Sequence, residues 1–210
     1  MPEFHALLDG YRRFRTGAYR EQKHRFDSLI EGQAPPVMVV SCCDSRVDPA
    51  TVFDTVPGQM FALRNVANLV PPYDSAGGLH GASAAIEFGV LGLEVRHIVV
   101  LGHARCGGIK AALSGAQIPG GAGFVDAWMT IIGAARSRVL IDRPADPQSA
   151  LEQEAIKISL ANLRSFPYIA EREADGRLKL HGAIFGIERG ELEVLDESTG
   201  IFRQPYSSPA

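Results

Sequence analysis

Short apolar runs alternate along the chain with longer segments of helical period. The runs 37–40 (VMVV) and 97–102 (HIVVLG) are apolar and rich in β-branched residues, which is typical of strands buried on both faces of a parallel sheet. Between them, 60–70 (MFALRNVANLV) predicts a further strand that ends in a polar turn. Near the C-terminus, 178–196 predicts two strands joined by the turn ERGE, which is a hairpin.

Helices are predicted between and after these strands. A short helical turn is expected within 44–59, with Pro49 near its start. Longer helices are expected at 79–93, from 107 onward, at 125–140 and from 151 to just before Pro167, with 115–124 as a loop. Strands that alternate with helices favour an α/β fold. We expect a central, mostly parallel β-sheet flanked by helices, with an antiparallel hairpin at its C-terminal edge.

The N-terminal segment predicts an amphipathic helical arm. Its apolar residues recur at helical spacing and are Phe4, Leu7, Leu8, Tyr11 and Phe14. The arginines between them are then the solvated face of the helix. Gly32, Pro35 and Pro36 end this pattern before the first strand. We expect a single domain over 1–210, with the arm at about 1–34 and the α/β core at 35–200.

Composition and charge exclude several classes of protein. The 210 residues are 46% hydrophobic and 21% charged, as in ordinary globular domains. The formal net charge of −3 offers no basic surface for nucleic acid. No apolar run approaches the roughly 18–20 residues that a membrane span requires, and the first residues do not resemble a signal peptide. We therefore expect a cytoplasmic protein with reduced cysteines, used for metal binding or catalysis.

The candidate chemistry follows two of the predicted strands. Cys42 and Cys43 come directly after 37–40, and His103 and Cys106 follow 97–102. Ligands of parallel sheets bind beyond the carboxyl ends of the strands, so neighbouring strands would bring these groups together. Thiolate and imidazole are the ligands that Zn²⁺ prefers. His103 and Cys106 fit one loop, and the remote third ligand is Cys42 or Cys43.

The number of ligands separates a structural zinc site from a catalytic one. A structural site closes with four protein ligands, whereas a catalytic site keeps one position for water. Asp44 is the candidate fourth ligand, and Arg46 can hold it away from the metal through two parallel hydrogen bonds. A disulfide is disfavoured because vicinal thiols bridge poorly. Phosphatase and phosphate-binding loops fail on spacing, since no arginine and no lysine stands where each loop requires it.

Three motifs together resemble the β-class carbonic anhydrases: CCDSRVDP, FALRNVANLVPPY and GHARCGGIK. The similarity runs from about residue 4 to about 200. It implies that Cys42, His103 and Cys106 bind zinc, while Cys43 is a bystander. It implies that Asp44 and Arg46 form the catalytic dyad beside the metal. The substrate pocket that it implies consists of Gln33, Phe61, Val66, Phe88 and Gly107.

The resemblance also implies an activity and an assembly. The activity is reversible hydration of carbon dioxide to bicarbonate and a proton by a zinc-bound hydroxide, with one Zn²⁺ per chain, and the assembly is a homodimer or homotetramer. Members with an inhibitory bicarbonate site carry a Trp where this chain has Val39, so the chain is similar to the plant-like, non-allosteric subgroup, although Arg64 is shared. The alternative is a non-catalytic, zinc-stabilised scaffold protein on the same fold.

Overall fold

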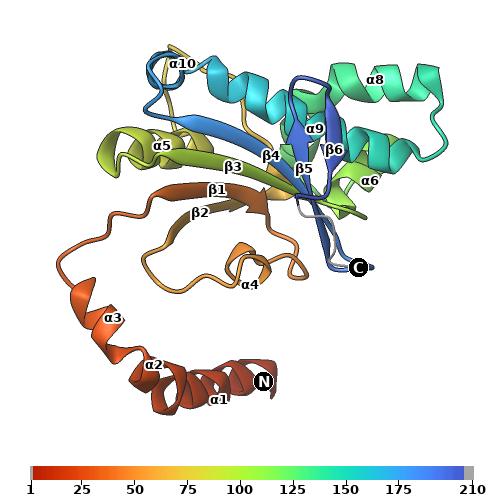
Figure 1. Ribbon diagram of the computed structural model, residues 1–210. Coiled ribbons are helices and arrows are strands. Elements are labelled where there is room, and N and C mark those ends of the chain that lie inside the picture. Colours follow the sequence, from red (N-terminus) through yellow and green to blue (C-terminus); the bar gives the residue numbers. More distant parts are fainter. Residues whose placement is uncertain (1, 206–210) are drawn as a thin grey trace, which may run out of the picture.

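The computed structural model describes residues 2–205, and six strands of this part form one sheet (Figure 1). Their order across the sheet is β2-β1-β3-β4-β5-β6. The first four are parallel, whereas β5 and β6 are antiparallel additions at one edge. The strands are β1 (Val37–Cys42), β2 (Met60–Asn65), β3 (His97–His103), β4 (Lys179–Gly186), β5 (Glu191–Asp196) and β6 (Ile201–Arg203). This confirms the predicted α/β class and the hairpin, and adds β6, which the sequence pattern did not predict.

The neighbouring strands β1 and β3 are largely buried because helices cover one face and apolar side chains fill the other. Side chains alternate between faces along a strand. Met38 and Val40 of β1 pack on one face into a core shared with α5, α9 and α10, and Val39 packs on the opposite face with Leu101 of β3. An apolar run without alternation therefore suits this position in the sheet.

Seven helices of the described core connect the strands and cover the sheet. They are α4 (Pro49–Val52), α5 (Gly81–Glu87), α6 (Gly107–Ser114), α7 (Phe124–Met129), α8 (Gly133–Asp142), α9 (Pro147–Arg164) and α10 (Pro167–Ala174). The short turn at Pro49 and the loop 115–123 agree with the sequence pattern. The helix expected at 79–93 instead changes after Glu87 into a π-helical turn over Phe88–Gly92.

One helix prediction was wrong, and one helix was not predicted. The segment 125–140 is not one helix, because the β-branched run Thr130–Ile132 forms a 3₁₀ turn before Gly133 and separates α7 from α8. The helix expected to end before Pro167 does so, since α9 ends at Arg164, but the sequence pattern did not predict α10, which begins at that proline. Proline suits the first position of a helix, where its missing N–H has no partner to lose.

Helix α9 lies unusually close to β3 and β4 because two glycines face it. A Cβ atom on Gly102 would lie 2.7 Å from Cδ1 of Ile156, and one on Gly182 would lie 2.8 Å from Cγ2 of the same side chain. These distances are shorter than any normal carbon contact. The glycines thus let α9 pack against the strands, and this packing brings the first turns of α9 to the end of β3.

The N-terminal arm consists of three helices, α1 (Pro2–Thr16), α2 (Ala18–Glu21) and α3 (Lys23–Ser28), that lie apart from the sheet (Figure 1). None of their described residues is buried. The predicted apolar stripe is present but faces solvent, with Leu7 71% exposed and Phe4 58% exposed. Across residues 2–205, no helix combines the length and the apolar character needed to cross a bilayer.

Candidate metal centre

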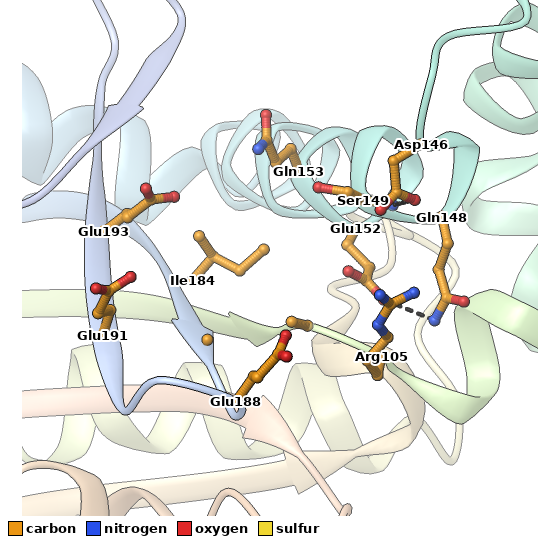
Figure 2. Close-up of a pocket in the computed structure, with 12 residues that line it drawn as sticks. Arg105, Asp146, Gln148, Ser149, Glu152, Gln153, Ile184, Glu188, Glu191 and Glu193 are labelled. Atoms are coloured by element: carbon orange, nitrogen blue, oxygen red, sulfur yellow. Dashed lines mark hydrogen bonds between the residues drawn. The ribbon is translucent and has the colours of Figure 1, made fainter.

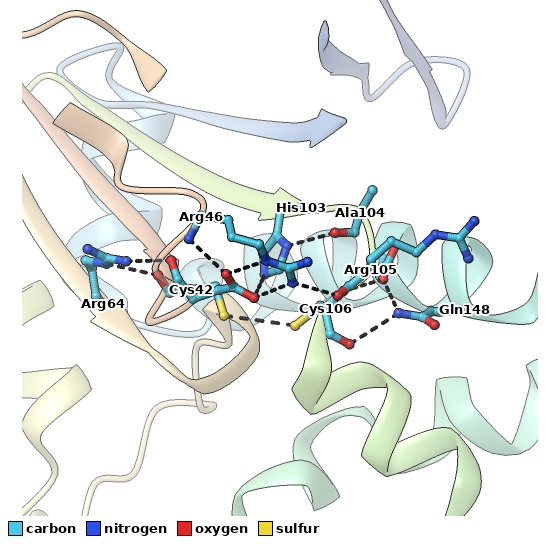
Figure 3. A network of polar contacts seen from close by, with 10 residues as sticks. Cys42, Arg46, Arg64, His103, Ala104, Arg105, Cys106 and Gln148 are labelled. Carbon is cyan, nitrogen blue, oxygen red and sulfur yellow. Dashed lines mark hydrogen bonds and ion pairs between the residues drawn. The ribbon is translucent and has the colours of Figure 1, made fainter. Parts of the chain in front are cut away.

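Three ligand side chains converge where β1 and β3 end. The two strands are parallel neighbours, so Cys42 and His103 leave the sheet at the same edge, and a short loop returns Cys106 to them at the start of α6 (Figure 3). The sulfur atoms of Cys42 and Cys106 lie 4.0 Å apart. The ligand atoms of all three residues lie within 4.8 Å of one another, and all three residues are buried.

The geometry of this group fits a zinc ion. Two sulfurs at ordinary zinc–sulfur distances in a tetrahedron lie about 3.8 Å apart, close to the separation here. Nδ1 of His103 donates a hydrogen bond to the Ala104 carbonyl at 2.9 Å, which leaves the lone pair on Nε2. That Nε2 is buried and has no hydrogen-bond partner among residues 2–205. A buried acceptor without a partner is costly, and a metal ion would satisfy it.

The two buried sulfurs influence each other's protonation. The contact with the Cys106 thiol lowers the pKa of Cys42 to about 4, and the same contact raises the pKa of Cys106. This contact therefore favours a thiolate on Cys42 while Cys106 keeps its proton. Binding a dication would release the remaining proton. Cys43, by contrast, is exposed and does not belong to the ligand group, which favours Cys42 as the remote ligand.

Asp44 lies beside the ligands but is held by Arg46. Its Oδ1 accepts hydrogen bonds from the backbone N–H and from Nε of Arg46 at 3.0 and 2.9 Å, and its Oδ2 accepts from Nη2 at 2.6 Å. These bonds are the main reason why the pKa of Asp44 lies far below its usual value. Its Oδ2 remains 3.9 Å from Nε2 of His103. The carboxylate is thus ionised, fixed and adjacent to the metal position.

Arg64 of β2 fixes the loop that carries Cys42 and Asp44. It donates to the carbonyl oxygens of Cys42 and Asp44 at 3.0 and 2.8 Å, and to Oδ2 of Asp48 at 2.7 Å. Asp48 in turn caps α4 by accepting from the N–H groups of Ala50 and Thr51. Three of the five N–H donors of Arg64 are therefore engaged within the chain. Sequence reasoning noted Arg64 only as a residue shared with the bicarbonate-inhibited members and missed this role. The signal that could have found it is a charged residue at the end of a partly buried strand, which requires acceptors.

The expected pocket residues fall into separate groups. Val66 and the start of α6 lie together near the ligands, since a Cβ on Gly108 would lie 2.9 Å from Cγ1 of Val66, and Gly107 precedes it. Phe61 and Phe88 pack on each other with ring centroids 5.9 Å apart. In the register of the sheet Phe61 pairs with Met38, four residues before Cys42, which corresponds to about 13 Å along the strand.

Gln33 is the farthest of the expected pocket residues from the ligands. It is exposed and lies on the segment that leads from the arm to the amino end of β1. Because β1 has six residues, its ends lie about 17 Å apart, and Cys42 is at the other end. One chain therefore does not bring Gln33, Phe61 and Phe88 to its own metal ligands.

Trp128 of α7 supports the turn that contains Val66, and sequence reasoning missed it. Its Nε1 donates to the Val66 carbonyl at 2.8 Å. In this turn Ala67 and Asn68 have φ values of 62° and 50°, which non-glycine residues rarely adopt. The indole hydrogen bond therefore contributes to holding a strained backbone beside α6. A tryptophan 62 residues further along the chain gives no local signal for such a contact.

The fold and the site together define a class of protein in which two cysteines and one histidine at the carboxyl edge of a parallel sheet can hold a metal. Comparison with known proteins identifies the family. The profile of the carbonic anhydrase family matches residues 37–192. A carbonic anhydrase of Synechococcus elongatus is 33% identical over 97% of this chain and 77% of its own length, and beta carbonic anhydrase 3 of Arabidopsis thaliana is 34% identical over 90% and 75%.

Solved structures agree with the sequence relatives. The structure of the β-carbonic anhydrase CcaA matches with a TM-score of 0.90 and 33% identity, covering 99% of this chain and 94% of the other. A tetrameric β-carbonic anhydrase of Sordaria macrospora matches with a TM-score of 0.80 and 30% identity over 93% and 98%. The chain belongs to the β-class carbonic anhydrases, lyases that hydrate carbon dioxide to bicarbonate and a proton. The enzyme is thus favoured over the non-catalytic scaffold.

Proposed function

We propose that the chain hydrates carbon dioxide at one zinc ion held by Cys42, His103 and Cys106. The observation that carries this proposal is that three buried ligand atoms lie within 4.8 Å of one another while the neighbouring carboxylate of Asp44 is engaged by Arg46. Three protein ligands leave one position for water, as in catalytic zinc sites. When bound there, zinc supplies a Lewis acid that makes a coordinated water more acidic and so available as a nucleophile near neutral pH.

The side chains around this position have complementary tasks. Asp44 accepts a hydrogen bond from the attacking oxygen and directs its lone pair toward the carbon of CO₂. Arg46 keeps the carboxylate ionised and in place through its three hydrogen bonds. Val66 and Gly107 offer a small apolar wall that suits an apolar substrate. The reaction consumes CO₂ and one water, and releases bicarbonate and one proton.

We also infer that a second copy of the chain completes each pocket. Gln33, Phe61 and Phe88 lie too far from the ligands of their own chain, so in an assembly they would serve the site of a neighbour. The arm supports this inference, because its exposed apolar side chains need a surface to cover them. A homodimer is then the smallest active unit, with 1–34 as its exchanged arm on the 35–200 core. The related Sordaria macrospora enzyme is described as tetrameric.

The cellular setting is inferred from the thiols. All three cysteines are free, and two of them are proposed as ligands, which requires that they remain reduced. We therefore infer a cytoplasmic enzyme.

Stopped-flow measurement of CO₂ hydration, together with the zinc content of the same sample, tests the function. The proposal expects one zinc per chain and hydration that is lost on chelation and restored by zinc. A sample with full zinc content and no hydration would leave the scaffold protein as the better description.

A further inference from the structure

The peptide bond between Arg105 and Cys106 is held from both sides. Its carbonyl oxygen, on Arg105, accepts a hydrogen bond from Nη2 of Arg46 at 3.1 Å. Its N–H, on Cys106, donates to Oε1 of Glu152 at 2.9 Å. One peptide group thus connects the guanidinium that holds Asp44 to a carboxylate on α9, which is far from the dyad in sequence.

A second side chain of α9 completes this clamp. Nε2 of Gln148 donates to the Cys106 carbonyl at 3.3 Å and to Oε1 of Glu152 at 2.9 Å. Gln148 and Glu152 are four residues apart, so they lie on the same face of the helix, and both project toward the Arg105 segment (Figures 2 and 3). The two side chains therefore bind the N–H and the C=O of the same zinc-ligand residue.

Burying the Glu152 carboxylate costs free energy, so its position needs hydrogen bonds that compensate for this cost. Its residue is only 4% exposed, and burial raises its pKa. A buried carboxylate is retained where it accepts hydrogen bonds that nothing else would satisfy. Its acceptor atom receives both the Cys106 N–H and the Gln148 amide. The backbone that it fixes is also strained, since Arg105 has a φ of 60°.

We propose that Glu152, assisted by Gln148, is a positioning residue of the metal centre. It holds the Arg105–Cys106 peptide so that the Cys106 sulfur stays in the ligand group and the Arg105 carbonyl keeps Arg46 on Asp44. This role rests on the proposed zinc site, but it concerns a residue outside the ligands and the dyad. It acts through hydrogen bonds to the backbone, so an uncharged acceptor of the same shape would preserve it.

Zinc affinity, measured by competition with a chromophoric chelator, is the first readout. Glu152→Ala should weaken zinc binding by roughly 10–100-fold, the usual effect of losing a residue that orients a metal ligand. Glu152→Gln keeps the acceptor oxygen and should stay close to the wild type. The matched control is Glu188→Gln, which removes a charge from the 210 Å³ cavity that Glu152 also lines but does not touch the Cys106 peptide (Figure 2).

Cobalt substitution gives a second readout that a merely structural role would not change. Replacing zinc by Co²⁺ should give a thiolate-to-cobalt absorption whose position and intensity differ in Glu152→Ala and match the wild type in Glu152→Gln and Glu188→Gln. The inference is overturned if folded Glu152→Ala has wild-type affinity and spectrum, or if Glu152→Gln is as impaired as Glu152→Ala. Failure of the zinc site itself is distinct, because the wild type and Cys106→Ala would then both bind no metal.

Discussion

At the scale of single residues, the carboxylates of Asp44 and Glu152 lie near the same candidate metal centre but accept hydrogen bonds from different donors. Asp44 accepts three hydrogen bonds from Arg46 and remains beside the metal position. Glu152 is buried and accepts from a backbone N–H on the other side of Cys106. We propose that the first acts on the attacking oxygen and that the second holds a ligand residue in place.

The Asp44→Asn variant should separate metal binding from catalysis. Asn keeps the size of the side chain but loses the charge that pairs with Arg46, and an NH₂ donor replaces one of its two acceptor oxygens. We expect the zinc content to be unchanged and CO₂ hydration to fall by roughly 10²-fold or more. Asp142→Asn, an exposed carboxylate at the end of α8, is the control. Stopped-flow rates near the wild type for Asp44→Asn would refute the role given to the dyad.

The sequence predicts the site residues that follow a local pattern and misses those whose contacts depend on how distant elements pack. His103, and Cys42 or Cys43, could be predicted because they follow apolar strands, and the family resemblance then selected Cys42. The two residues of the dyad are only two positions apart. Glu152 could not be predicted, because its partner lies 46 residues away and the contact depends on where α9 crosses the sheet. Its own helix offers no sign of it, since a glutamate near a helix start is usually solvated.

At the scale of elements, the sheet follows from local pattern more closely than the helices do. The strands β1 and β3 are apolar on both faces, and few other structures suit such runs. The helices break at places that the helical spacing of apolar residues does not reveal, such as the 3₁₀ turn at Thr130–Ile132 and the π-helical turn after Glu87. The short β6 lacks a pattern of its own and is defined by pairing with β5.

The contact between α9 and the sheet makes Gly102 sensitive to substitution. In Gly102→Ala the added methyl group would lie 2.7 Å from Ile156, so α9 must shift or the side chain must change rotamer. We expect the free energy of unfolding to fall by about 1–3 kcal/mol in urea denaturation. Gly133→Ala, where the new methyl meets nothing within 4 Å, should be neutral or slightly stabilising. Equal stability of the two variants would show that α9 is not packed as tightly as described.

At the scale of the whole molecule, the exposed apolar stripe of the arm has no covering surface within the described part of a single chain. It has an apolar stripe and no buried residue within Pro2–Ser28. The sequence predicted the stripe, but not which surface covers it. The same holds for Gln33, Phe61 and Phe88, since a sequence does not say which copy of a residue reaches a given site.

A charge placed in the arm should therefore change the assembly and, through it, the activity of the metal site. Leu7→Glu changes a residue that is 71% exposed in the single chain, so the fold of the core should be unaffected. If a second copy covers this stripe, the variant should form a smaller assembly in light scattering and lose hydration activity while keeping its zinc. Arg15→Gln, an exposed change on the same helix, should keep the wild-type size. An unchanged assembly for Leu7→Glu would exclude the arm as the contact.

The distance between Gln33 and the end of its own β1 has a consequence for mixed populations. Suppose that Cys106→Ala chains and Gln33→Ala chains, each inactive alone, are unfolded together and refolded as random dimers. Each site of a heterodimer combines the metal ligands of one chain with Gln33 of the other. One site therefore contains both substitutions, and the other site contains neither. Mixing the two inactive variants should then restore about a quarter of the wild-type active sites. An enzyme whose active site lies within one subunit would recover no activity in this experiment.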